Sequence, residues 1–404
     1  EILQRIRVSR SVEGAFRRAT GLGVAELSDR WSDALRAVYF PEVAAREHLD
    51  AIGRALVTTD NGGYYNTSPA ISPQGDRVAF LTAKDGLFDV YVVEARRGAR
   101  PQKLIDGQTT PQFESLRILT PGLSWSPEGT HIAVAASSGP HETVALVDVA
   151  TGNARHIPLA GIDAVHNVAW HPQGHWVAFT GTKGPQSDLY LLDLESEGLT
   201  NLTDDLWTEH EPAWTPDGSG LVFHSERGPH TRLKSALPDS FAIRDHAYGQ
   251  YDLYLLERDS VSGSWATDLE QLTNDPIWDE TSATFGPDSD EVLFISDQNG
   301  IYNLHALTRS TGQVRPLTDL AVGVTQVSAA ANGTRAVVMS LKEGVPSLYL
   351  LARPFERTMG RDSLAPNVWA QRVQPKRQAP TLAIAATSTV EGNPLLRDAA
   401  DGTP

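Results

Sequence analysis

The chain has 404 residues and a formal net charge of −16 at pH 7, because 50 acidic residues outnumber 34 basic ones. An acidic surface repels phosphate backbones and anionic lipid, so neither nucleic acid nor a membrane surface is expected as a partner. The sequence has no cysteine, which excludes disulfides, thiolate metal sites and cysteine nucleophiles. No apolar run approaches the roughly 20 residues of a transmembrane helix, and the charged first ten residues do not form a signal peptide.

The first 53 residues have the pattern of helices. Ser11 is a plausible N-cap, and Pro41 is predicted to begin a further helix after the first long one. The segment is either a helical cap packed on the next domain or the end of a domain that lies upstream. The longer helix is expected to carry one apolar stripe, formed by Leu27, Trp31, Leu35 and Val38.

A short motif then recurs six times through the middle of the chain. A full copy has Ser or Thr, Pro, an acidic or amide residue and Gly, and an apolar triplet follows it. Proline presets φ in a tight turn and glycine tolerates positive φ, so each copy predicts a turn between two strands. The copies begin at Ile71, Trp125, Trp170, Trp214, Phe285 and, least faithfully, Ala329.

Each turn is followed by further strand-like segments. In the third copy, for example, these are residues 177–179, 188–192 and 201–203, and the first two are nearly continuous apolar runs. Four strands per unit, with a spacing mostly in the forties, are typical of a propeller blade. The sequence therefore predicts an all-β fold, a six-bladed β-propeller of four-stranded antiparallel blades.

The last copy lacks a fourth strand of its own. Residues 55–59 resemble the Leu-Thr strands that end other copies, so we expect this N-terminal strand to complete the last blade and close the ring. The propeller is then predicted to span residues 54–355. Residues 356–404, rich in Pro, Ala and Thr, are predicted to form a linker or an extended tail.

The repeat resembles the WD40-like (PD40) repeat of TolB and of the propellers attached to prolyl oligopeptidase-type and tricorn-type peptidases. The resemblance covers about residues 55–353 and implies a periplasmic or cell-envelope location and protein partners. Residues 21–31 also resemble the closing helices of a metallopeptidase-like domain that precedes such propellers in some bacterial envelope proteins. On that interpretation the catalytic part lies upstream of Glu1.

The sequence contains no familiar catalytic motif. His141-Glu142 and His210-Glu211 begin like a zinc-peptidase helix, but neither pair has a second histidine at the required spacing. Gly-x-Ser-x-Gly and the phosphate-binding Gly-x-x-x-x-Gly-Lys are both missing. The chain is therefore expected not to be an enzyme, with no cofactor and no assigned metal site.

Polar residues enter the innermost strands of several blades, where a propeller has one mouth of its central channel. They form either an acidic binding funnel, which could also hold a cation through carboxylate oxygens, or a solvated rim that hydrogen-bonds neighbouring strand ends. The second interpretation is the simpler one. The candidate binding residues are His166, Asn167, Glu209, His210, Glu211, Asp279 and Glu280.

Two tryptophans in the connections between blades, Trp207 and Trp278, are candidates for partner contacts, because aromatic residues are enriched at interface centres. The insertion at residues 229–250 is predicted to be either a lid over a channel mouth or a tolerated loop.

Taken together, these features favour a non-catalytic scaffold that binds protein or peptide in the bacterial cell envelope. Two alternatives stay open. The propeller could be the substrate-gating or accessory module of a peptidase whose catalytic domain lies outside this chain. It could also bind a cation or small ligand in the central channel.

Overall fold

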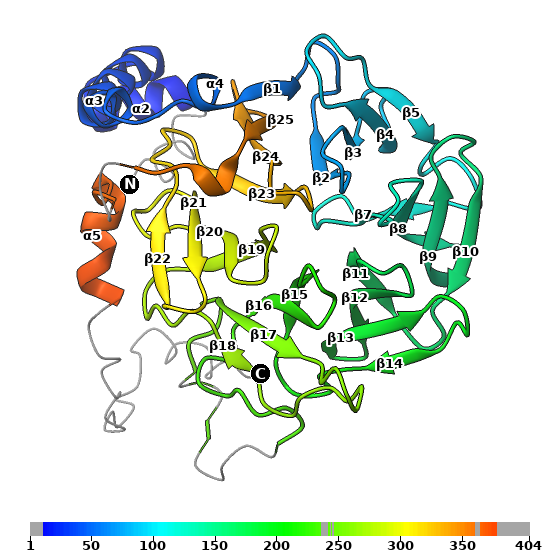
Figure 1. Ribbon diagram of the computed structural model, residues 1–404. Helices are drawn as coiled ribbons and strands as arrows, with labels where there is room; N and C mark the ends of the chain where they lie inside the picture. Colours follow the sequence, from blue (N-terminus) through cyan, green and yellow to red (C-terminus); the bar gives the residue numbers. More distant parts are fainter. Residues whose placement is uncertain (1–10, 236–240, 243, 245, 360–363, 378–404) are drawn as a thin grey trace, which may run out of the picture.

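The structure is a computed structural model that describes residues 11–235, 241–242, 244, 246–359 and 364–377. Six antiparallel sheets stand around a central axis, as the repeat predicts (Figure 1). Each sheet has four strands in its path, and one sheet contains an additional short strand. We number the sheets as blades 1 to 6 in chain order.

The strands of each blade run from the channel outwards. Blade 1 contains β2 (Asn66–Ile71), β3 (Arg77–Thr82), β4 (Asp89–Glu94) and β5 (Gln102–Ile105); blade 2 contains β6 (Ser115–Leu116), β7 (Leu123–Trp125), β8 (His131–Ser138), β9 (His141–Asp148) and β10 (Ala154–Pro158); blade 3 contains β11 (Ala164–Trp170), β12 (Trp176–Lys183), β13 (Gln186–Asp193) and β14 (Leu199–Asn201). Blade 4 contains β15 (Glu209–Trp214), β16 (Gly220–Ser225), β17 (Asp252–Glu257) and β18 (Glu270–Gln271); blade 5 contains β19 (Glu280–Phe285), β20 (Glu291–Ser296), β21 (Asn303–Thr308) and β22 (Gln313–Pro316); blade 6 contains β23 (Val324–Ala329), β24 (Arg335–Lys342), β25 (Val345–Ala352) and β1 (Arg54–Val57).

The hydrophobic core lies between neighbouring blades. The apolar triplets after the turns are buried and form successive clusters that join one sheet to the next. The recurrent tryptophans tie the blades together in the same way, because Nε1 of Trp125 donates to the Ala70 carbonyl at 2.8 Å and Nε1 of Trp214 donates to the Ala169 carbonyl at 3.0 Å. These residues therefore belong to the contacts between blades.

The ring closes through the N-terminal strand, which confirms the prediction from residues 55–59. Strand β1 pairs antiparallel with β25, with Arg54 opposite Leu350 and Val57 opposite Leu348. Blade 6 thus combines three strands from the end of the propeller with one from its beginning (Figure 1). Pairing with β1 covers the edge that β25 would otherwise expose.

Blade 2 has an innermost strand that is split. Strands β6 and β7 both pair with β8, and residues 117–122 leave the sheet between them. The side chain of Arg117, from this interruption, binds the carboxylate of Glu142 and donates through Nε to the Val165 carbonyl at 2.6 Å. Blade 2 therefore carries an insertion within its inner strand.

The N-terminal segment forms α2 (Val12–Thr20), α3 (Val24–Ala44) and α4 (Leu49–Ile52). Ser11 caps α2 as expected, since its hydroxyl accepts from the Gly14 amide at 3.1 Å. The prediction that Pro41 begins a new helix is wrong, because α3 continues through it to Ala44. Proline removes one backbone donor, and the hydrogen bond that is lost here, to the carbonyl of residue 37, is one of the last in the helix.

The segment after β25 is not simply extended. It forms the 3-10 helix η2 (Pro354–Glu356) and then α5 (Val368–Arg377). Arg357 binds the Glu47 carboxylate at 2.6 Å, and the Asp319 carboxylate binds Arg46. These contacts hold the segment after the propeller and the end of the N-terminal helices against blade 5. The tail predicted beyond residue 377 lies outside the described residues.

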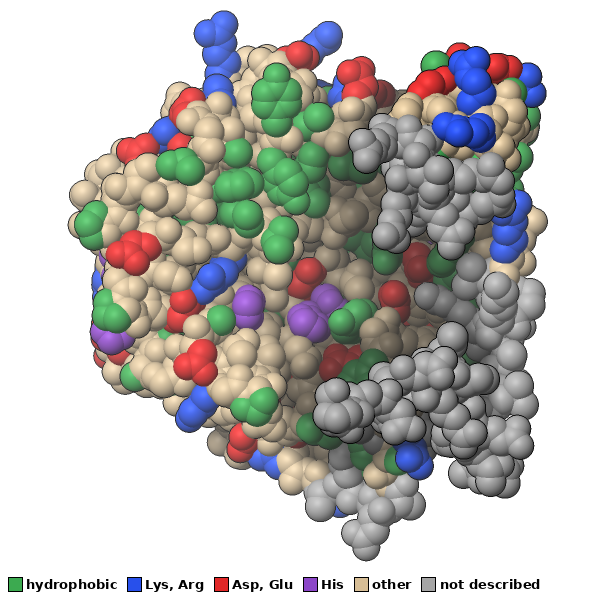
Figure 2. Space-filling model, turned by 180° about the vertical axis from the view of Figure 1, so that it is seen from behind, with side chains coloured by type: hydrophobic (Ala, Val, Ile, Leu, Met, Phe, Trp, Pro, Cys, Tyr) green, Lys and Arg blue, Asp and Glu red, His purple; other side chains and the backbone are tan. Residues whose placement is uncertain are grey.

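The opposite face of the molecule has a mixed surface. Histidine and acidic side chains gather near its middle (Figure 2). Among the helices that the structure describes, none is long and apolar enough to cross a membrane.

Candidate functional site

The innermost strands share an irregularity at one position. Register shifts interrupt the pairing of β2, β11, β15, β19 and β23 with the next strand. Ser68, Glu211 and Ser282 have positive φ angles of 51°, 51° and 50° there, and Asn167 lies in the shift of β11. Gln326, the counterpart in β23, directly follows the shift of that strand and pairs with Met339. A bulge turns a side chain away from the alternation of the strand, and this one creates a set of polar side chains around the channel.

These polar side chains are linked around the channel by hydrogen bonds. The Ser68 amide donates to Oε1 of Gln326 at 2.9 Å, and the Glu211 amide donates to Oδ1 of Asn167 at 3.3 Å. The hydroxyl of Ser282 donates to the Glu211 carboxylate. Each bond joins two blades, so the five residues form two hydrogen-bonded groups, Ser68 with Gln326 and Asn167 with Glu211 and Ser282.

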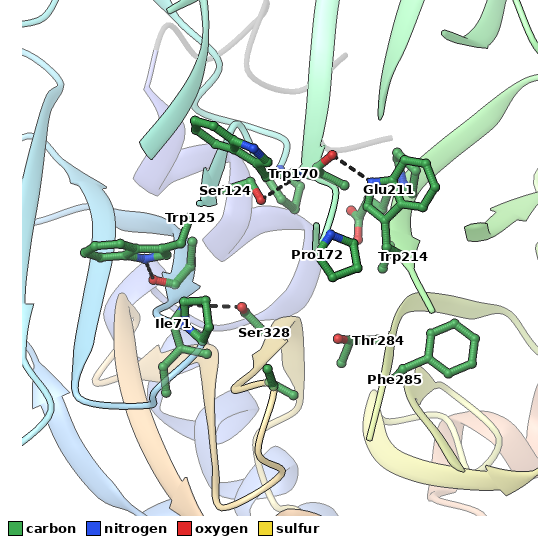
Figure 3. A pocket seen from close by; sticks show the side chains of 18 of the residues that line it. Ile71, Ser124, Trp125, Trp170, Pro172, Glu211, Trp214, Thr284, Phe285 and Ser328 are labelled. Atoms are coloured by element: carbon green, nitrogen blue, oxygen red, sulfur yellow. Dashed lines mark hydrogen bonds between the residues drawn. The ribbon is translucent and has the colours of Figure 1, made fainter. Parts of the chain in front are cut away.

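A cavity of about 550 Å³ is lined by Asn167, Glu211 and Ser282 and by residues of the turns between the first and second strands of the blades. Its side chains come from different blades and surround one space (Figure 3). Prolines of five of the six turns line it, and rigid aromatic and proline side chains make up much of its wall. The turn prolines are Pro73, Pro127, Pro172, Pro216 and Pro287, and the aromatic residues include Trp125, Trp170, Trp214 and Phe285.

Asn167 and Glu211 offer a donor and an acceptor at this cavity. Asn167 is 2% exposed and its Nδ2 is buried without a hydrogen-bond partner. Burial raises the pKa of Glu211 to about 7, although the Ser282 hydroxyl opposes the rise. Both side chains line the cavity, so a ligand that offers an acceptor to Asn167 and a donor to Glu211 would satisfy groups that the protein itself leaves incompletely bonded.

Of the seven residues predicted at the channel mouth, the structure places Asn167 and Glu211 in the cavity wall. His166 contacts the Thr182 hydroxyl at 3.2 Å and lies outside the lining. His210 stacks on His224 with ring centroids 5.2 Å apart, and burial lowers the pKa of His210 to about 4. Neighbouring strands thus enclose both His166 and His210.

The three remaining candidates make contacts within blade 4, within blade 5, and between these two blades. Glu209 is fully buried and binds the Arg227 guanidinium. Glu280 is 5% exposed and accepts from the Ser296 hydroxyl at 3.3 Å. Asp279 accepts from the Tyr251 amide at 3.1 Å. None of the three lines the central cavity.

Trp207 and Trp278 are both buried, each only 4% exposed, instead of lying on the surface. Trp207 stacks on His230 at 4.9 Å beneath the insertion between β16 and β17, and Trp278 packs with Ala370 of α5. A partner could reach either ring only if the covering segment moved.

The pattern search did not find Ser68, Ser282 and Gln326, although the sequence holds a signal for them. Each lies five positions before the residue at the proline position of its turn, as do Asn167 and Glu211. Aligning the copies on that position would have found the whole set.

Within the part of the chain that the structure describes, no group of three His, Asp or Glu side chains could hold a metal ion.

Comparison with known proteins agrees with the architecture. Residues 105–240 match the family model of the TolB β-propeller domain. A search of curated protein sequences finds no match.

Three solved structures are similar to this chain at low sequence identity. A TolB candidate from Agrobacterium tumefaciens is 17% identical, with a TM-score of 0.50 over 72% of this chain and 91% of that chain. TolB from Acinetobacter baumannii is 18% identical, with a TM-score of 0.44 over 72% of this chain and 63% of that chain. An oligogalacturonate lyase from Vibrio parahaemolyticus is 13% identical, with a TM-score of 0.45 over 74% of this chain and 90% of that chain. At such identities the likeness concerns the fold alone. The chain is a six-bladed β-propeller, and residues 105–240 match the family model of the TolB β-propeller domain.

Proposed function

We propose that this protein is a non-catalytic scaffold of the bacterial cell envelope that binds a protein or peptide segment in its central cavity. The observation that carries the proposal is the buried Nδ2 of Asn167, which lines the cavity and has no partner. A peptide carbonyl is a suitable acceptor for this donor, and a peptide N–H or amine is a suitable donor for Glu211.

The cavity wall supports the same function. Proline and tryptophan side chains lose little conformational freedom when a ligand covers them, so apolar contact with them is gained at low entropic cost. A volume of about 550 Å³ lies within the usual range of ligand pockets and accommodates a few peptide residues. The envelope location rests on the likeness to the TolB domain family.

Filling the cavity tests this function. Thr284 lines the cavity, so Thr284→Trp should place an indole in the space that the ligand needs. We expect the partner captured from envelope extract by the wild-type protein to be reduced at least tenfold with this variant. Val261→Trp is the matched control, because Val261 is 94% exposed and lies outside the cavity. Equal capture by Thr284→Trp and wild type would exclude the cavity as the binding site.

The buried carboxyl of Glu211 should make stability depend on pH. Its pKa is about 7 in the folded protein and about 4.3 in an unfolded chain, so the folded state holds the proton more tightly. Stability is then greatest below pH 4.3 and falls as the pH rises towards 7. Between pH 5 and pH 8 the wild type should lose on the order of 2 kcal/mol more than Glu211→Gln, measured by urea unfolding. Parallel pH profiles for the two proteins would contradict the raised pKa.

A second candidate function is that of an accessory module attached to a peptidase domain outside this chain. The observation that favours it is the surface of α3, which contains no buried residue. Trp31 and Phe40 are each 64% exposed, and Val38 is 44% exposed. Trp31 and Val38, seven residues apart, lie on one face of the helix, and large exposed apolar side chains on one face are typical of a surface that contacts another domain.

The α3 surface gives a separate prediction. Trp31→Ser combined with Phe40→Ser should change the free energy of unfolding of this chain by less than about 0.5 kcal/mol, because both side chains are already in water. In the product of the whole gene, the same pair should weaken any docking of an upstream domain, seen as faster proteolysis between the two. An open reading frame without a peptidase domain upstream of Glu1 would remove this candidate.

A further inference from the structure

Glu211 supplies the carboxylate of the central cavity. Among the residues that the structure describes, the lining contains no other Asp or Glu and no Lys or Arg. The hydroxyl of Ser282 donates to this carboxylate, and the pKa of Glu211 reflects burial and this hydroxyl without a contribution from a basic side chain. The protein therefore does not neutralise the charge that forms when Glu211 ionises.

The other titratable side chain of the lining, His171, does not act as a cation. His171 is 2% exposed, its Nδ1 accepts from the Gln173 amide at 3.1 Å, and its Nε2 lies 3.3 Å from the Gly218 carbonyl. These two contacts fit a neutral ring that carries its proton on Nε2, and burial lowers the pKa of His171. The cavity therefore carries the negative charge of Glu211 without a compensating positive charge.

An unsatisfied donor lies beside this carboxylate. Oδ1 of Asn167 accepts from the Glu211 amide at 3.3 Å, so the side-chain amide of Asn167 packs against the backbone of Glu211. Nδ2 of the same side chain is buried without a partner, and both residues line the cavity. One ligand that offers a donor to Glu211 and an acceptor to Asn167 needs these two groups only a few atoms apart.

The aromatic wall favours a cation over an anion. The indole N–H groups of Trp125, Trp214 and Trp170 donate to backbone carbonyls of the protein at 2.8, 3.0 and 3.3 Å. These donors are not available to a ligand, whereas the faces of aromatic rings attract cations. Glu211 and Trp214, both on β15, lie near each other in this wall (Figure 3). A carboxylate ligand would meet the charge of Glu211 and no cation.

We propose that the cavity binds the free amino terminus of a peptide, with the α-ammonium group at Glu211 and the carbonyl of the first residue at Asn167. This inference rests on the function proposed above and names the part of the peptide that enters. In an amino-terminal residue the nitrogen and the carbonyl oxygen are separated by two carbon atoms, which suits an acceptor and a donor that lie side by side. An internal segment brings a neutral N–H and leaves the ionised carboxylate without a compensating charge. A lysine side chain has no acceptor next to its ammonium group.

Calorimetric titration with three small probes tests this site. Leucyl-alanine amide carries both the ammonium group and the carbonyl, and it should bind the wild type saturably. N-acetyl-leucyl-alanine amide lacks the positive charge and 3-methylbutylamine lacks the carbonyl, so each should bind at least tenfold more weakly. Glu211→Gln should reduce the affinity for leucyl-alanine amide at least tenfold and change that for the acetylated probe less than twofold. Glu195→Gln is the matched control, because Glu195 is exposed and lies outside the cavity.

The pH dependence of binding separates loss of the charge from a structural effect of the variant. Burial raises the pKa of Glu211 to about 7, and a peptide α-ammonium group loses its proton at about pH 8. The affinity for leucyl-alanine amide should therefore increase about tenfold or more from pH 5 to pH 7.5 as Glu211 ionises, and Glu211→Gln should abolish this increase. The opposite trend, in which affinity falls over this range, would mean that the protonated carboxyl donates to the ligand and would contradict the proposal.

The inference fails if leucyl-alanine amide does not bind saturably or if Glu211→Gln and Glu195→Gln behave alike. Equal binding of 3-methylbutylamine would overturn the assignment to a peptide terminus. Equal binding of the free and acetylated peptides, with both lost in Thr284→Trp, would also overturn it but would leave the proposed function intact. The proposed function fails by a separate result, which is equal capture of the envelope partner by Thr284→Trp and the wild type.

Discussion

Val57→Asp should lower the free energy of unfolding by about 4 kcal/mol, a large part of the stability of a typical domain. Val57 is 0% exposed and lies on β1, the strand that completes blade 6. Its cluster combines Ile71 and Phe80 of blade 1 with Leu348 of blade 6. A carboxylate at this position would be buried without a cation and would disrupt the contact between the first and last blades.

Urea unfolding monitored by tryptophan fluorescence measures this loss. Val261→Asp is the control, because Val261 is 94% exposed, and it should change stability by no more than about 0.5 kcal/mol. A loss below about 1 kcal/mol for Val57→Asp would mean that the ring is held together without β1. Limited proteolysis adds a second readout, since weakened closure should expose the β1 region to cleavage before the rest of the propeller.

The fold could be predicted because its signals are local and repeated. A turn such as residues 72–75 needs proline early and a glycine that adopts positive φ, and Gly75 has a φ of 74°. The strand that closes the ring was also recognisable, because Leu56, Val57 and Thr58 repeat the pattern that ends other blades. Six copies of one pattern reinforce one another, whereas a single helix has no such support. Pro41 illustrates that difference, because its effect depended on how close it lay to the helix end.

The candidate site was only partly predictable, because a bulge decides which of two consecutive residues faces the cavity. His210 and Glu211 were equally good candidates in sequence, but the bulge in β15 turns Glu211 to the channel and leaves His210 against His224. Nor does sequence spacing show burial by distant segments. Ala370 lies far along the chain from Trp278 and still covers it. Such contacts depend on where the chain returns after completing the ring.

Arg227→Met should be about as destabilising as the change in β1, with a loss of about 3–5 kcal/mol, because it leaves buried charge without its partner. The guanidinium contacts Asp205 and Glu209, and the side chains of these carboxylates are 7% and 0% exposed. Arg155→Met is the control, because Arg155 and its partner Glu197 are both largely exposed and such a pair contributes at most about 1 kcal/mol.

The pH dependence of this variant identifies the cause of the loss. Burial raises the pKa of Glu209 and the Arg227 guanidinium opposes that rise, so removing the arginine should raise the pKa further. A carboxyl with a raised folded-state pKa contributes less stability as the pH increases. The deficit of Arg227→Met should therefore grow between pH 5 and pH 8, and adding Glu209→Gln should recover at least half of it. A deficit that is independent of pH and is not reduced in the double variant would mean that Arg227 acts through packing against Phe223 and Tyr254, and not through its charge.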